Sequence, residues 1–88
     1  MNLLDRETLV GRLVYSKAGR DKGKPYIIVK VLDEKYVFIS NGVLKTVEKP
    51  KLKKLMHLNI SNAGISGISI DNLIIENFLQ SYDKNEEV

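Results

Sequence analysis

The chain has no cysteine, no tryptophan, two prolines and one histidine among its 88 residues. Without cysteine it can form neither a disulfide framework nor a thiolate metal site. No apolar run approaches the roughly 20 residues that a membrane-spanning helix needs. The first residues also lack the basic-then-apolar order of a signal peptide. We therefore expect a cytoplasmic protein without a membrane partner.

Side chains suited to catalysis are scarce as well. The single histidine, His57, has no acidic residue near it in the sequence, and the carboxylates are not clustered. The stretch GRDKGK, residues 19–24, lacks the spacing to a Lys-Ser/Thr pair that a phosphate-binding P-loop requires. Few groups remain for acid–base, nucleophilic or metal catalysis. We expect a protein that is not an enzyme and that uses no cofactor or metal.

Positive charge, by contrast, is concentrated in one part of the chain. Residues 1–58 hold thirteen of the fourteen lysines and arginines against six acidic residues, which leaves +7. Residues 59–88 hold one lysine against five acidic residues, which leaves −4 and accounts for the net charge of +3. A cationic body with an acidic tail suggests that the body meets a polyanion. The alternative, left open by charge alone, is that these residues only keep a small domain soluble.

Apolar and β-branched runs predict strands in the first half of the chain. They cover residues 8–16, 26–32 and 36–40, and in the second run alternation places Ile27, Val29 and Val31 on one face. Their number and brevity favour a small, curved antiparallel sheet.

The dipeptide Asn41-Gly42 predicts a hairpin, because both residues accept the positive φ of a type I′ turn. Its partner strand would be residues 43–47, ended by Pro50. Residues 52–58 are either a helical turn or a last strand. Closing four or five such strands into a β-barrel would remove the exposed sheet edges, so we expect a mainly β barrel over residues 1–58.

The last third of the chain changes in composition. Residues 59–69 are rich in Ser, Asn and Gly and are expected to form a loop. Asp71 can cap a C-terminal amphipathic α-helix over residues 70–83, followed by a polar tail at 84–88. The expected apolar stripe comprises Ile70, Leu73, Ile74, Phe78 and Tyr82. This stripe either packs on the barrel or offers a docking or dimerisation surface.

Two basic clusters are candidates for contact with a polyanion. The first lies between two strands, where glycine lets backbone amides approach a phosphate and basic side chains supply counter-charge; its members are Gly19, Arg20, Lys22, Gly23 and Lys24. A solvated hairpin loop explains this cluster equally well. The second cluster favours contact with a nucleic-acid backbone over the solvated-loop interpretation. It comprises Lys45, Lys49, Lys51, Lys53, Lys54 and His57. His57 is either a packing residue or a neighbour of bound RNA.

Aromatic residues are few, at 7% of the chain. Tyr15, Tyr26 and Tyr36 either stack on bases or belong to the barrel with their hydroxyls at its rim. The pattern favours recognition of backbone and shape over base reading, which fits structured RNA better than sequence-specific DNA.

Residues 9–58 resemble a KOW-motif domain of the fourteen-e family of large-subunit ribosomal proteins and its small bacterial relatives. The matching features keep their order and spacing: Gly11-Arg12, Ser16 before AGRDKGK, an apolar strand ending in Asp33, Gly42, Pro50-Lys51, Lys53 and His57-Leu58. The resemblance implies an SH3-like β-barrel that binds ribosomal RNA and has no catalytic role.

The same resemblance implies which segments contact RNA. They are the loop from Ala18 to Pro25, with Gly23 matching the motif's glycine, and the basic segment from Lys51 to His57. Residues 59–88 depart from the family pattern, since their tail is acidic. We therefore expect an RNA-binding protein of the ribosome, or a factor in its assembly or in translation. The alternative is a protein-interaction adaptor, in transcription or translation, that uses the barrel or the C-terminal helix.

Overall fold

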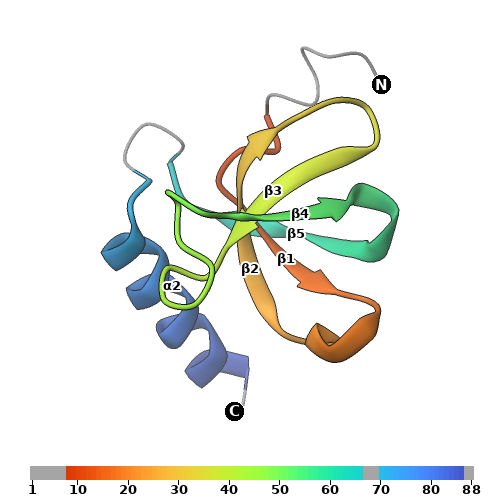
Figure 1. Ribbon diagram of the computed structural model, residues 1–88. Helices are drawn as coiled ribbons and strands as arrows, with labels where there is room; N and C mark the ends of the chain where they lie inside the picture. The colour runs from red at the N-terminus through yellow and green to blue at the C-terminus, as the bar shows by residue number, and fades with distance from the viewer. Residues whose placement is uncertain (1–7, 67–69, 87–88) are drawn as a thin grey trace.

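The computed structural model describes residues 8–66 and 70–86, with the backbone alone in residues 83–86. Five strands form one antiparallel sheet in the order β4-β3-β2-β1-β5, and a C-terminal helix packs against it (Figure 1). The elements are β1 (Arg12–Ser16), η1 (Gly19–Asp21), β2 (Pro25–Val31), β3 (Tyr36–Ser40), β4 (Lys51–Lys54), η2 (Leu55–His57), β5 (Leu58–Gly64) and α2 (Asn72–Glu86), where η marks a 3₁₀ turn. The predicted mainly β class and the C-terminal helix are confirmed.

The sheet buries apolar side chains on both faces. Its inner face holds a cluster, called here the inner cluster, of Leu9, Val14, Tyr26, Ile28, Val37, Ile39 and Leu58. Its outer face meets α2 through a second cluster, the helix cluster, of Leu13, Ile27, Ile75 and Leu79. Successive residues of β2 alternate between the two clusters, as the period-2 geometry of a strand requires. Strand β2 therefore joins both cores.

A β-bulge in β2 changes this alternation. Ile28 pairs with Ile39 and Lys30 with Phe38, so two residues of β2 oppose one residue of β3. Beyond the bulge, Val31 pairs with Val37 and packs against the inner cluster. The prediction that Val31 shares a face with Ile27 is wrong for this reason. The bulge leaves Lys30 on the outer face, beside Phe38.

The predicted Asn41-Gly42 hairpin is also wrong, because residues 43–47 form no strand. The side chain of Asn41 accepts backbone N–H groups of Val43, Leu44 and Lys45 through Oδ1, each at 3.0 Å. Those amides are then not free to pair with β3, as happens when an Asn side chain replaces a ladder partner. On the edge of β3 opposite β2, the pairing strand is β4. Pro50 precedes β4 and does not end a strand over residues 43–47.

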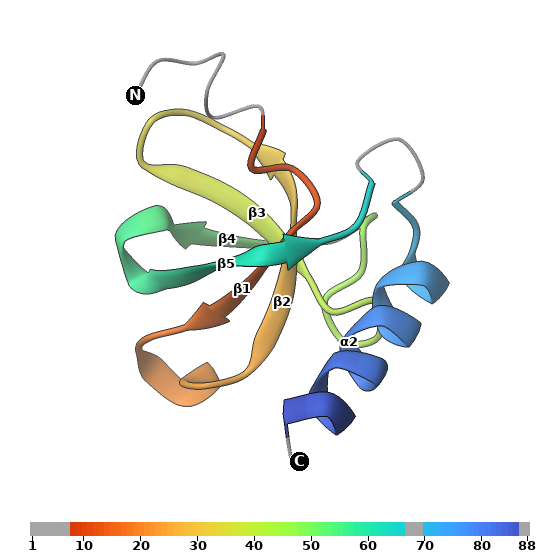
Figure 2. The same cartoon turned by 180° about the vertical axis from the view of Figure 1, so that it is seen from behind.

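The chain after residue 51 resolves one open alternative and differs from one prediction. Residues 52–58 divide between the end of β4, the turn η2 and the first residue of β5. The predicted loop 59–69 contains most of β5, which pairs with β1 (Figure 2), while residues 67–69 lie outside the described part. β5 is an edge strand whose side chains are mostly exposed, so its sequence carries little apolar alternation. The sheet thus extends beyond the predicted boundary at residue 58.

Helix α2 is capped by the predicted residue but begins at Asn72 rather than at residue 70, and its buried face only partly matches the predicted stripe. Asp71 caps it, since its Oδ1 accepts the N–H of Ile74 at 2.8 Å. The buried residues are Ile75 and Leu79, whereas Leu73 is 64% exposed. Ile74, also placed in the predicted stripe, is 37% exposed, while Ile70, Phe78 and Tyr82 do pack against the helix cluster. The helix continues to Glu86, so part of the predicted polar tail at 84–88 is helical.

The loop between β3 and β4 supports the start of α2. Asn72 accepts the N–H of Val47 through Oδ1 and donates through Nδ2 to Glu48, both at 2.8 Å. Gly42 has φ +81°, and a Cβ at this position would lie 2.3 Å from the carbonyl oxygen of Asn72. Only a residue without a side chain allows the loop and helix to approach so closely.

We expect Gly42→Ala to lower the free energy of unfolding by about 2 kcal/mol or more, because left-handed strain and a backbone clash add together. Gly19→Ala is the matched control: its φ is +78°, yet nothing lies within 4 Å of the added Cβ. The control should lose only about 1–2 kcal/mol in urea denaturation. Equal losses would show that α2 does not rest on Gly42.

We expect Ile75→Ala to cost about 2–4 kcal/mol of unfolding free energy, since a fully buried isoleucine leaves a cavity. The neighbouring Ile74→Ala should cost less than about 1 kcal/mol. Urea denaturation of both variants compares two adjacent isoleucines that differ in burial. A larger loss at Ile74 would mean that the helix turns the other face to the sheet.

Candidate functional site

The loop between β1 and β2, residues 17–24, is a closed turn that exposes its basic side chains. The N–H of Gly23 donates to the carbonyl of Ser16 at 2.7 Å, and the Ser16 hydroxyl donates to the carbonyl of Ala18 at 3.0 Å. Arg20, Lys22 and Lys24 are exposed. Gly19 and Gly23, at φ +78° and +83°, have open space where a Cβ would stand. The glycines therefore leave the loop backbone accessible to a ligand.

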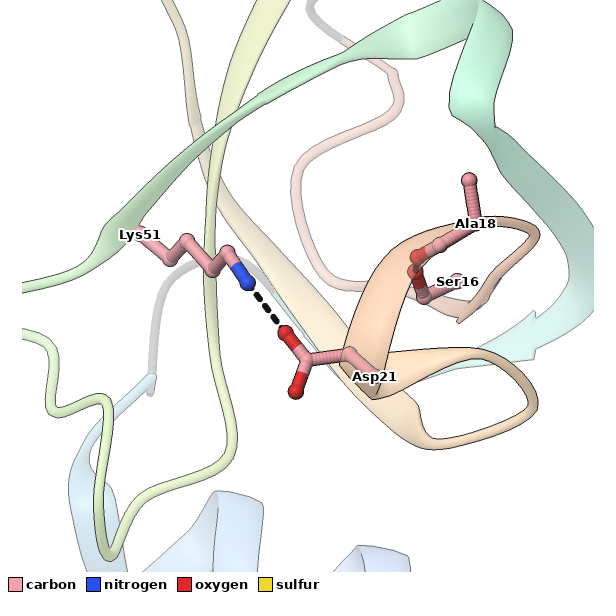
Figure 3. A network of polar contacts seen from close by, with 4 residues as sticks. All are labelled: Ser16, Ala18, Asp21 and Lys51. Atoms are coloured by element: carbon pink, nitrogen blue, oxygen red, sulfur yellow. Dashed lines mark hydrogen bonds and ion pairs between the residues drawn. The ribbon is translucent and has the colours of Figure 1, made fainter.

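The one carboxylate in this loop is held by the body of the protein. Asp21 forms an ion pair with Lys51, the first residue of β4 (Figure 3). Tyr26, a residue of the inner cluster, lies near enough to affect the pKa of Asp21. The ion pair therefore ties the loop to β4, and the negative charge of Asp21 is compensated locally.

The pKa values of these groups reflect their contacts. The hydrogen bond from Lys51 lowers the pKa of Asp21 below its ordinary value of 3.8, with smaller contributions from the charge of Lys51 and from Tyr26. Burial raises the pKa of Tyr26 to about 12, and the neighbouring negative charge of Asp21 adds to this effect. At neutral pH the lowered pKa keeps the Asp21 carboxylate ionised, and the raised pKa keeps the Tyr26 phenol neutral.

Three connections lie mostly on the side of the molecule away from α2: residues 17–24, 32–35 and 55–57 (Figures 1 and 2). Lys24, at the end of the first connection, is the exception, since it lines a hollow with Glu76 and Gln80 of α2. We call this side the loop end. Backbone hydrogen bonds join the connections, from Lys17 N–H to the carbonyl of His57 and from Leu55 N–H to the carbonyl of Lys35, both at 2.8 Å. Asp33 closes its own turn by accepting the N–H groups of Lys35 and Tyr36. The loop end is therefore a continuous, hydrogen-bonded surface.

The structure divides the predicted site residues between two regions. Those at or next to the loop end are Gly19, Arg20, Lys22, Gly23, Lys24, Lys51, Lys53, Lys54 and His57. Lys45 and Lys49 instead lie in the connection between β3 and β4, beside the start of α2. Lys51 and Lys53 are half-buried, because they share a sheet face with Ile39 and Val37 of the inner cluster. The second basic cluster of the sequence is thus not one surface.

Sequence reasoning missed two lysines of the loop end. Lys17 and Lys35 are both exposed there. Lys17 and Lys22 line a shallow hollow together with Tyr15, Ser16, Gly23 and Asn59. Lys17 directly follows β1 and belongs to the same turn as Arg20 and Lys22. This position in the sequence could have placed it in the first basic cluster. With Arg20, Lys22 and Lys24, these lysines outnumber the exposed carboxylates Asp33 and Glu34 and leave the loop end with an excess of positive charge.

The chain matches no protein-family model, and no curated protein matches it. Within residues 8–66 and 70–86, no group of three or more histidine and carboxylate side chains is placed to hold a metal ion. No helix in that same part of the chain is long and apolar enough to cross a membrane.

We expect Asp21→Asn to lower the free energy of unfolding by about 1 kcal/mol or less at pH 7, as for other partly exposed pairs. The folded-state pKa of Asp21 is lowered, so its stabilisation is present above the ordinary pKa and is lost as the pH falls through the lowered value. The difference from wild type should therefore shrink below about pH 4.

Thermal or urea unfolding from pH 7 to acid checks this dependence, and Lys51→Met provides the control. In the Lys51→Met background, Asp21→Asn should have a much smaller effect, because the pair is already broken. A difference that stays constant down to strongly acidic pH would show that Asp21 does not act through its charge.

Proposed function

We propose that the protein is a non-catalytic RNA-binding protein associated with the ribosome, its assembly or translation, and that its sheet is an SH3-like barrel of the KOW type. The five-stranded antiparallel order supports the barrel, as does the three-residue turn η2 between the edge strands β4 and β5. That short link keeps the ends of the two edges close together. The resemblance of residues 9–58 to KOW domains supports the same fold.

The observation that carries the proposal is the loop end itself. Exposed cationic side chains from two separate connections lie there: Lys17, Arg20, Lys22 and Lys24 from the first and Lys35 from the second. Asp21 is paired with Lys51, and the exposed carboxylates of Asp33 and Glu34 offset only part of this positive charge. Lysines and arginines grouped in this way bind a nucleic-acid backbone by releasing its counterions. The open backbone at Gly19 and Gly23 leaves room for phosphate oxygens beside Arg20. Structured RNA, recognised by shape and backbone, fits a surface of this kind.

A specific observation also favours a second candidate, a protein-interaction adaptor. Leu73 and Ile74 are exposed on α2, and Leu44, in the loop beside the helix, is 82% exposed. Exposed apolar side chains of this size can serve as anchors for a protein partner. RNA binding and protein binding would use opposite sides of the molecule.

We expect the triple variant Arg20→Ala/Lys22→Ala/Lys24→Ala to bind a structured ribosomal RNA fragment more weakly than wild type at every salt concentration. For each phosphate that the variant no longer neutralises, the slope of log affinity against log salt should fall by about one unit. Fluorescence anisotropy over a salt series, with a duplex DNA of equal charge as second ligand, measures both quantities. The RNA should bind more tightly than the DNA.

The matched control is Lys45→Ala/Lys49→Ala, which removes exposed charge from the other side of the molecule. This variant should change affinity and slope much less than the triple variant. A loss of at least two thirds of that in the triple variant, in proportion to the two charges removed against three, would mean that only total charge matters. Weak binding unaffected by the triple variant would favour the adaptor.

A further inference from the structure

The register of the sheet builds a second surface with its own pattern. On β3, Phe38 lies opposite Lys30 of β2 and Leu52 of β4. Two residues earlier, Tyr36 lies opposite Lys54 of β4, and its carbonyl accepts the N–H of Leu32. Each rung therefore has an aromatic ring in the centre, a lysine on one side and a leucine on the other. We call these six residues the open sheet face: Lys30, Leu32, Tyr36, Phe38, Leu52 and Lys54.

The open sheet face points away from the inner cluster. Val37 and Ile39 of β3 are buried in that cluster, so the alternating Tyr36 and Phe38 point to the outer side. Helix α2 covers this outer side over Leu13 of β1 and Ile27 of β2. Among the described residues, neither hydrophobic cluster includes a residue of the open sheet face. The face therefore remains beside the helix rather than under it.

The exposure and composition of this face indicate a ligand with apolar rings and negative charge. Leu32 is 51% and Leu52 47% exposed, while Lys30 and Lys54 are exposed at opposite edges of the face. Contiguous apolar side chains on a sheet surface are costly in water and mark a binding site. Rings at alternate positions of a central strand, about 7 Å apart, can each stack on one unpaired base. The flanking lysines are then placed to reach the phosphates between the bases.

Two hollows fit this arrangement. One lies at the outer side of the sheet and is lined by Val29, Lys30, Phe38, Val47, Pro50 and Ile70. It offers a partly apolar recess of which Phe38 is one wall. The other is lined by Glu34, Lys35, Lys54, Leu55 and Met56. This second hollow joins the open sheet face, through Lys54, to the loop end.

We propose that the open sheet face binds a single-stranded RNA segment, with Phe38 and Tyr36 stacking on bases and Lys30 and Lys54 contacting phosphates. This rests on the proposed function, in that the ligand is RNA; it adds the class of RNA and a second subsite. The loop end holds the backbone of a structured element, and the open sheet face takes the unpaired nucleotides next to it.

Three labelled RNAs, measured by fluorescence anisotropy on the full chain, test the proposal. They are an oligouridine of about eight nucleotides, an abasic ribose-phosphate strand of equal length and charge, and a hairpin with a minimal loop. The double variant Tyr36→Leu/Phe38→Leu should bind oligouridine at least about tenfold more weakly, since neither position can then stack on a base. Its affinity for the abasic strand and for the hairpin should stay within about twofold of wild type.

Two further variants separate stacking from structural effects. Phe38→Tyr keeps an aromatic ring and should retain the affinity for oligouridine. Leu44→Ala removes an exposed apolar side chain from the loop beside α2 and should leave that affinity unchanged. Circular dichroism and thermal unfolding establish that each variant is folded before its affinity is compared.

The outcomes distinguish this inference from the proposed function. Hairpin binding by the loop end, together with equal affinity for oligouridine and the abasic strand, would overturn the stacking subsite and leave the proposed function standing. A fall in oligouridine affinity in Leu44→Ala as large as in the double variant would also overturn it, as would a peptide partner that occupies the face while oligouridine does not. Failure to bind any of the three RNAs would overturn both.

Discussion

Burial of β2 on both faces is the constraint on which the rest of this small structure depends. Tyr26 and Ile28 enter the inner cluster, and Ile27 enters the helix cluster. A domain of this size has little apolar surface to bury, so a strand that contributes to two cores adds stability that one-sided packing could not supply. It also explains why α2 is part of the fold: Ile75 and Leu79 cover the outer face of β2, which would otherwise be exposed.

Seating the helix determines the path of the connection between β3 and β4. Asn41 turns the chain away from a hairpin, Gly42 lets it lie against the backbone of Asn72, and Asn72 in turn holds Val47. The side chains of Asn41 and Asn72 accept backbone N–H groups that a regular strand would have paired in the sheet, whereas Gly42 supplies only the space for the close approach. The connection therefore replaces ladder pairing with a support under the helix, and Lys45 and Lys49 are carried away from the loop end as a result.

The fold separates two kinds of surface. The side with α2 presents exposed apolar residues such as Leu73, and the opposite side presents the cationic loop end. Between these two sides, the β-bulge in β2 places Lys30 on the outer face beside Phe38. Lys30 and Lys54 together give the open sheet face its positive charge. The Asp21–Lys51 ion pair supports the basic loop in the same way, because it ties the loop to β4 and neutralises the one carboxylate of that loop. The exposed basic side chains of the loop therefore extend from a fixed base.

The sequence by itself determined the features that depend on neighbouring residues: β3, most of β2, the turn at residues 17–24 and the Asp71 cap all follow from local patterns. It also placed Arg20, Lys22 and Lys24 correctly in one exposed loop. Only the tertiary structure decided that β4, and not residues 43–47, pairs with β3 on the edge opposite β2. The reason is that Asn41 can either form a hairpin turn or accept the backbone N–H groups that follow it. The tertiary structure likewise decided that Ile75 and not Ile74 is buried, since the apolar residues of α2 spread over a face too wide to be buried whole and the choice depends on the shape of the sheet beneath. Which lysines share a surface was settled in the same way, because charges distant in the sequence meet only where the strands bring their ends together.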